Sequence, residues 1–156
     1  MLHAQFKNLN KYTIKLVCET RKKYTLPDDI SRVRCSADVP DMIRAVFNVK
    51  EWHNEKFGMI GLDTQNNVIS IDIMHEGTIN QSIVYPREIV TRALLTNAAS
   101  VILFHNHPSG SLKPSKADLE VTERLVKALE TIDISVHDHI ILTRFEYVSF
   151  SEKGLL

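Results

Sequence analysis

The chain has 156 residues, of which 44% are hydrophobic and 24% charged, a composition typical of a folded globular domain and unlike that of a disordered chain. The 19 basic and 19 acidic residues cancel overall. We find no apolar run long enough for a transmembrane helix and no signal peptide, so we expect a cytoplasmic protein whose cysteines, Cys18 and Cys35, are reduced.

The charges are divided unevenly along the chain. Residues 1–35 contain eight basic and three acidic residues, a net charge of +5, so the remaining 11 basic and 16 acidic residues give −5. We therefore expect a short basic N-terminal arm (1–35) followed by one domain (36–156). Such an arm could contact nucleic acid or an acidic partner, or it could be a solvated tail. We favour the tail, because no helix-turn-helix pattern or aromatic-interleaved basic motif accompanies the charge.

The predicted elements begin with a short strand at 12–19, inside the arm. Residues 36–49 have apolar side chains at helical spacing, which predicts a helix. Apolar runs at 56–63 and 68–75 are separated by four polar residues, which is typical of a β-hairpin.

The second half of the chain alternates between helices and strands. A helix is expected to begin at Pro86, because proline suits the first turn of a helix. The continuous apolar run 99–107 predicts a strand buried on both faces. A helix at 116–131 and strands at 134–142 and 146–150 complete the chain. These elements predict an α/β or α+β fold, with a mixed sheet between helices.

Two histidines end the apolar strand. His105 and His107 are two residues apart, so on a strand they project from the same face. A catalytic zinc ion typically takes three protein ligands and leaves a position for water. Asp118 is the nearest acidic candidate, in the first turn of the following helix.

The same residues have a structural interpretation that needs no metal. Ser115 and Asp118 have the spacing of a helix-capping box, in which each side chain accepts a hydrogen bond from the other residue's backbone. An H-x-H pair can also be two ordinary strand-end side chains. From the residues alone, both interpretations stay open.

The segment FHNHPSGSLKPSKAD (104–118) matches the JAMM metalloprotease signature, which is H-x-H, seven residues, Ser, two residues, Asp. The amino-acid sequence resembles the RadC-type branch of that superfamily. Further hallmarks of this branch occur in EKFGMIGLDTQNNVIS (55–70), GTINQSIVYPREIVTRALLTNAASVILFHNHPSG (77–110) and DHIILT (138–143). The resemblance covers about residues 36–156.

This resemblance implies a JAB/MPN fold, which is a cytidine-deaminase-like mixed central β-sheet flanked by helices, with one zinc ion at the sheet edge. The implied ligands are His105, His107 and Asp118. The family's upstream catalytic glutamate corresponds to Glu55, as general base, and Ser115 would hydrogen-bond the developing oxyanion or orient the water.

The expected function is that of a zinc-dependent metallopeptidase, in which activated water attacks a peptide or isopeptide-like amide of a substrate that the sequence does not specify. The alternative is a DNA-repair-associated accessory protein that binds nucleic acid, with the metal site vestigial or used in DNA processing. RadC-type proteins have a historical association with DNA repair. Residues 1–35 are, however, too short for the helix-hairpin-helix region of full-length RadC-type proteins, which lowers the expectation of DNA binding.

A second H-x-H pattern occurs at His137-Asp138-His139, on a predicted strand. No carboxylate follows at a matching spacing. We therefore interpret Asp138 and His139 as structural or supporting groups rather than as zinc ligands.

Overall fold

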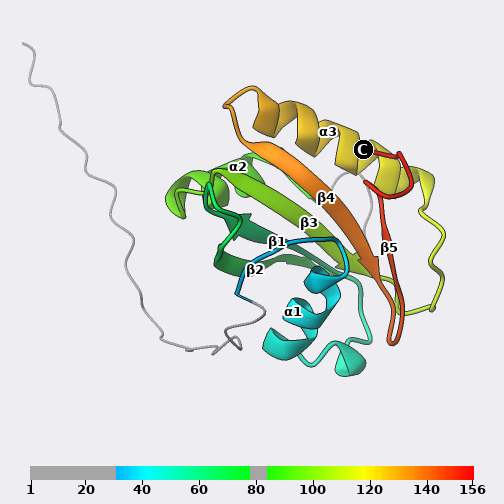
Figure 1. The fold of residues 1–156 in the computed structure, drawn as a ribbon. Coiled ribbons are helices and arrows are strands. Elements are labelled where there is room, and N and C mark those ends of the chain that lie inside the picture. The colour runs from blue at the N-terminus through cyan, green and yellow to red at the C-terminus, as the bar shows by residue number, and fades with distance from the viewer. Residues whose placement is uncertain (1–30, 78–83) are drawn as a thin grey trace, which may run out of the picture.

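The computed structural model describes residues 31–77 and 84–156, so the strand expected at 12–19 lies outside the described residues. Within these ranges five strands form one sheet in the order β2-β1-β3-β4-β5 (Figure 1). The strands are β1 (Lys56–Leu62), β2 (Val68–Glu76), β3 (Ser100–Asn106), β4 (Ser135–Leu142) and β5 (Tyr147–Ser149). The helices are α1 (Asp38–Val46), the single-turn 3-10 helix η2 (Val49–Glu51), α2 (Pro86–Leu95) and α3 (Lys116–Glu130).

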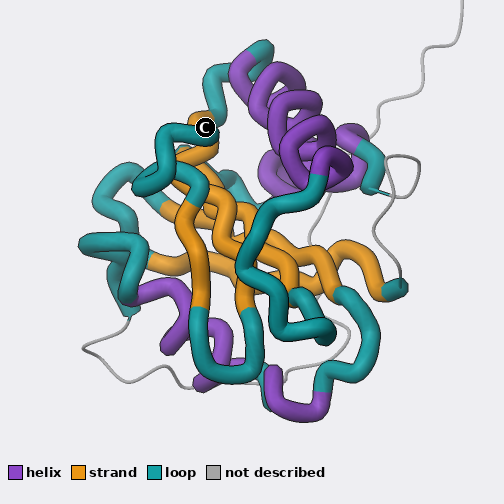
Figure 2. Tube along the Cα trace, turned by 90° about the vertical axis from the view of Figure 1, so that its right-hand side faces the viewer, coloured by secondary structure: helices purple, strands orange, loops and turns teal. Residues whose placement is uncertain are grey.

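The central strand β3 runs parallel to β4 and antiparallel to β1, while the outer pairs are antiparallel. The sheet is therefore mixed, as predicted. All seven residues of β3 are buried, because α1 packs on one face of the sheet and α2 and α3 pack on the other. Figures 1 and 2 show helices on both sides of the sheet.

The β1–β2 hairpin follows from the chemistry of its turn. The carboxylate of Asp63 accepts hydrogen bonds from the backbone N–H groups of Gln65 and Asn67, at 2.8 and 2.9 Å. Asn66 takes a positive φ of 63°, a conformation that asparagine tolerates better than most residues. The polar turn predicted between the two apolar runs is confirmed.

The helix predicted at 36–49 is shorter in the structure. It begins at Asp38, whose side chain accepts hydrogen bonds from the N–H groups of Arg34 and Cys35 and so stabilises the preceding turn. It ends because Phe47 is extended, with φ −124° and ψ 141°. The ring of Phe47 packs against that of Trp52, 5.7 Å away, and the chain continues into η2.

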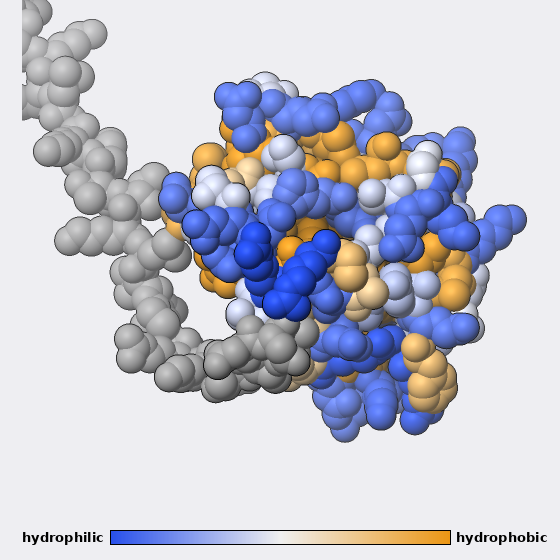
Figure 3. Space-filling view, viewed as in Figure 1, coloured by the Kyte–Doolittle hydropathy of each residue, from blue (hydrophilic) through white to orange (hydrophobic). Residues whose placement is uncertain are grey.

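Polar side chains cover most of the face in Figure 3, with apolar side chains visible in patches between them. No helix in residues 31–77 or 84–156 combines the length and apolar character needed to cross a membrane.

Candidate metal centre

The two histidines of the H-x-H motif lie at the C-terminal end of β3 and project toward α3. His105 is fully buried and lies beside Phe57 of β1 and Ile141 of β4 in the sheet register. His107 follows the strand and is only partly buried. Their Nε2 atoms lie 3.0 Å apart, so strand alternation brings both rings to one point.

Asp118 completes this group from the first turn of α3. Its Oδ1 lies 3.3 Å from Nε2 of His105, and its Oδ2 lies 3.4 Å from Nε2 of His107. The carboxylate is buried, with 2% of the residue exposed. The structure thus brings the three predicted ligands together into a group that could hold a metal ion.

The capping box is present as well. The N–H of Ser115 donates to Oδ2 of Asp118 at 2.7 Å, and the N–H of Asp118 donates to Oγ of Ser115 at 3.1 Å. The two interpretations of these residues are therefore compatible. The cap fixes the first turn of α3, and that turn aims the Asp118 carboxylate at the histidines.

A chain of hydrogen bonds behind His105 determines which of its ring nitrogens carries hydrogen. The hydroxyl of Thr122 donates to the carbonyl oxygen of Asp118 at 2.5 Å. Since it has one hydrogen, it must accept from Nδ1 of His139, 2.6 Å away. Burial holds the pKa of His139 well below its ordinary value of 6.5, so this ring is neutral and its Nε2 is an acceptor.

Nδ1 of His105 lies 2.8 Å from that acceptor and must therefore donate to it. Burial also lowers the pKa of His105, so its Nε2 presents a lone pair toward Asp118. His107 has the same orientation for a different reason. Its Nδ1 lies 2.7 Å from the backbone oxygen of Ser111, which can only accept, so Nε2 again faces the site without hydrogen when the ring is neutral.

This arrangement of donors suits a cation. Two Nε2 lone pairs and a carboxylate converge with separations of 3.0, 3.3 and 3.4 Å. Ligands about 2.0–2.1 Å from a tetrahedral zinc ion lie roughly 3.3 Å from one another. Supporting hydrogen bonds on the outer nitrogen of each ligating histidine are also usual at such sites. The residues present fit a metal ion of this kind.

The pKa values of Asp118 and His107 bear on whether a proton can occupy the position that a metal ion would take. Burial acts to raise the pKa of Asp118, but the two imidazoles beside its carboxylate and the N–H of Ser115 outweigh burial and hold the pKa well below its usual range. The hydrogen bond with Asp118 raises the pKa of His107 above 6.5, against the effect of burial. A proton on His107 therefore competes with a metal ion for the same lone pair.

Glu55 and Ser115 lie at the border of the group. The half-buried Glu55 directly precedes β1, and its charge raises the pKa values of both His105 and His107, so its carboxylate lies within electrostatic reach of the pair. Ser115 is exposed, and the cap uses its oxygen as an acceptor, which leaves its hydroxyl hydrogen able to point outward. The catalytic roles of both residues stay predictions.

Asn106 holds the Glu55 segment in place, and sequence reasoning missed it. This buried side chain projects from the opposite face of β3 to the histidines. Its Oδ1 accepts from the N–H of Lys56 at 2.7 Å, and its Nδ2 donates to the carbonyl oxygen of Asn54 at 3.2 Å. Both residues adjoining Glu55 are therefore tied to the strand that carries His105 and His107.

A family profile described as RadC-like JAB domain matches residues 33–155. The chain belongs to the RadC-like JAB domain family. This result confirms the resemblance drawn from the sequence, and the mixed five-stranded sheet with its three described helices is consistent with the JAB/MPN fold.

Relatives of this RadC-like JAB domain occur in several bacteria. A UPF0758 protein of Vibrio vulnificus (strain YJ016) is 51% identical over 106 residues, which cover 68% of this chain and 47% of that protein. UPF0758 protein YeeS of Escherichia coli (strain K12) is 48% identical over 111 residues, covering 71% and 75%. A UPF0758 protein of Thiobacillus denitrificans is 42% identical over 149 residues, covering 94% and 66%. The chain thus spans about half the length of the Vibrio relative.

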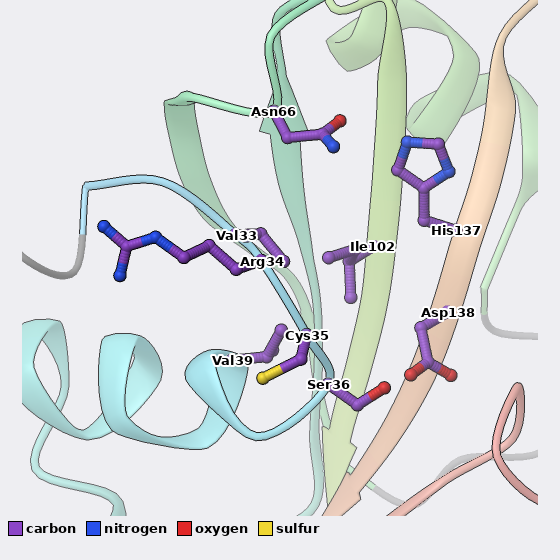
Figure 4. Close-up of a pocket in the computed structure, with 9 residues that line it drawn as sticks. All are labelled: Val33, Arg34, Cys35, Ser36, Val39, Asn66, Ile102, His137 and Asp138. Atoms are coloured by element: carbon purple, nitrogen blue, oxygen red, sulfur yellow. The ribbon is translucent and has the colours of Figure 1, made fainter.

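The second H-x-H pattern of this RadC-like JAB domain is divided between the two faces of β4. A register shift in the pairing with β3 falls beside His137, so strand alternation is interrupted there. His139 faces His105, whereas His137 and Asp138 line a cavity of about 290 Å³ between β4, β3 and the segment before α1 (Figure 4).

Asp138 is a structural residue in this arrangement. Its Oδ2 accepts from the hydroxyl of Ser149 at 2.6 Å, and its Oδ1 accepts from the N–H groups of His139 and Ser151 at 2.7 and 3.0 Å. It therefore joins β4 to β5 and to the turn that follows. His139, by contrast, supports the candidate metal centre (His105, His107 and Asp118) directly, through its hydrogen bond with His105.

Proposed function

We propose that the chain is a zinc-dependent hydrolase that cleaves a peptide or isopeptide-like amide bond. The observation that carries this proposal is the convergence of two Nε2 lone pairs and one buried carboxylate, with the outer nitrogen of each imidazole fixed by a hydrogen bond. His105, His107 and Asp118 would hold the ion. When bound, zinc would supply Lewis-acid activation, lowering the pKa of a water molecule toward neutrality.

Glu55 is assigned the proton transfers. It lies within electrostatic reach of the histidine pair, and its carboxylate would take a proton from the attacking water and deliver it to the leaving nitrogen. Ser115 would donate its hydroxyl hydrogen to the oxyanion that develops on the amide. His139 and Thr122 would hold His105 in its neutral, ligating form.

The test measures metal content and hydrolysis together. We expect the purified chain to bind one zinc ion, and Asp118→Asn to lose both zinc and hydrolysis of a proteome-derived peptide library. Glu55→Gln should keep the zinc and lose hydrolysis, whereas Glu130→Gln, an exposed carboxylate at the end of α3, should keep both. Cleavage that survives Glu55→Gln would remove Glu55 from its role. A chain that takes up no zinc would contradict the proposal as a whole.

A further inference from the structure

A cavity of about 330 Å³ adjoins the candidate metal centre on the side of His107. Three segments enclose it: the stretch from η2 toward β1, the end of β3 with its following loop, and the turn between β4 and β5. Its size lies within the usual range of small-molecule and side-chain binding sites. The residues that matter to its chemistry are Lys50, Trp52, His107 and Arg144.

The position of the cavity suits an approaching substrate. His105 and Asp118 are almost wholly buried, with 0% and 2% of each residue exposed, whereas His107 remains partly accessible. The cavity borders on the accessible member of the group. Asn106, which ties the Glu55 segment to β3, contributes to its wall as well. Because Asn106 and Trp52 lie on the α1 side of the sheet, a peptide bound in the cavity would approach the candidate metal centre from that side, past His107 at the end of β3.

The charge of the cavity is of one sign. Lys50 and Arg144 line it, and no acidic residue does so among those described. Neither Lys50 nor Arg144 forms an ion pair with a carboxylate within residues 31–77 and 84–156. Two cations without carboxylate partners at one cavity favour an anionic ligand.

The remaining walls suit a peptide. The half-buried Trp52 contributes an aromatic surface that can pack on aliphatic groups, and Arg144 lies with its guanidinium 5.4 Å from the ring centre of the exposed Phe145. An arginine held against a ring keeps its planar donors available, and these match the two oxygens of a carboxylate.

We propose that this cavity binds a carboxylate of the peptide substrate, either an acidic side chain or a free chain terminus, close to the amide bond that is hydrolysed. This inference rests on the proposed function, because it names the substrate class of the same site. Lys50 and Arg144 bind the carboxylate, and Trp52 covers the carbon chain that bears it.

The single tryptophan of the chain makes the cavity directly observable. Trp52 is the only tryptophan in the sequence, so its fluorescence reports occupancy without any need for hydrolysis. The probes are three peptides: acetyl-Ala-Ala-Glu-Ala-amide, the same peptide with glutamine in place of glutamate, and the glutamine peptide with a free terminal carboxylate. They are titrated at low ionic strength into the full chain carrying Glu55→Gln, with one equivalent of zinc, so that they remain intact.

We expect at least one carboxylate peptide to bind about fivefold to tenfold more tightly than the neutral peptide, the scale of one or two partly exposed ion pairs. Which of the two binds more tightly distinguishes a side-chain carboxylate from a chain terminus. The preference should disappear in the double variant Lys50→Gln, Arg144→Gln. It should persist in the control Lys127→Gln, Lys153→Gln, which removes two exposed lysines outside the cavity lining.

Equal binding of all three peptides would overturn the inference, and so would a preference that survives in the Lys50, Arg144 double variant. Tighter binding of a thymidine octamer than of either carboxylate peptide, lost in the same double variant, would assign the cavity to nucleic acid instead. None of these outcomes alters zinc content or Glu55-dependent hydrolysis, so failure of this inference is distinguishable from failure of the proposed function.

Discussion

Nε2 of His139 lies 2.8 Å from Nδ1 of His105, and this contact between residues 34 positions apart decides which nitrogen of His105 faces Asp118. Thr122 sets the direction of the hydrogen bonds through His139 to His105, because its single hydroxyl hydrogen is donated to the carbonyl oxygen of Asp118 and it can therefore only accept from His139. The candidate metal centre therefore depends on α3 twice, once through the Asp118 carboxylate and once through Thr122 one turn later.

Thr122→Val tests this chain of hydrogen bonds. Valine cannot accept from His139, so the orientation of the two imidazoles is no longer enforced, and we expect zinc affinity to fall by about tenfold or more. Thr122→Ser keeps the hydroxyl and should retain affinity. Competition with a fluorescent zinc chelator measures both. Equal affinity in the valine and serine variants would show that the hydroxyl does not act on the candidate metal centre.

Zinc binding should weaken as the pH falls. The hydrogen bond with Asp118 raises the pKa of His107 above 6.5, so a proton occupies its Nε2 at and below that pH in the metal-free protein. Because a protonated imidazole has no lone pair, the apparent zinc affinity should decrease from about pH 8 to about pH 6. Calorimetric titrations in buffers of different ionisation enthalpy would detect the proton released. His53→Gln, at an exposed histidine, should leave the profile unchanged.

Asn106→Ala separates positioning of Glu55 from metal binding. The variant loses the hydrogen bonds to Lys56 and Asn54 on either side of Glu55, and it leaves the partly buried N–H of Lys56 without this partner. We expect the free energy of unfolding to fall by about 1–3 kcal/mol and hydrolysis to fall by about tenfold or more, with the zinc stoichiometry unchanged. If the variant lost both zinc and activity, Asn106 would instead be shown to support the histidines. kcat is measured at a temperature below the unfolding transition of both proteins, so that a smaller folded fraction does not lower the value for the variant.

Ser115→Ala tests the double use of the cap. Loss of the N-cap oxygen should cost about 1 kcal/mol of unfolding free energy in chemical denaturation. If Ser115 also serves the oxyanion, kcat should fall far more than this loss of stability explains. Ser115→Asp restores a capping acceptor without a hydroxyl hydrogen, so it should recover stability and not kcat. Full activity in either variant would confine Ser115 to the cap.

Much of the fold could be predicted from local patterns. The apolar runs and polar turn of the β1–β2 hairpin, the start of α2 at Pro86 and the span of α3 all depend on neighbouring residues. The expected helix at 36–49 was too long, because the backbone becomes extended at Phe47, whose ring packs against Trp52, and helical periodicity does not record this change.

The candidate site divides in the same way. The spacing of His105 and His107 on a strand, and of Ser115 and Asp118 in a cap, is local geometry, so each pair could be read from neighbouring residues. The meeting of the two pairs and the groups that support them depend on how distant segments pack. The pairing of β3 with β4 brings His139 behind His105. The register shift beside His137 keeps that histidine away from the candidate metal centre. Such contacts depend on strand register between distant segments, which no short-range periodicity records.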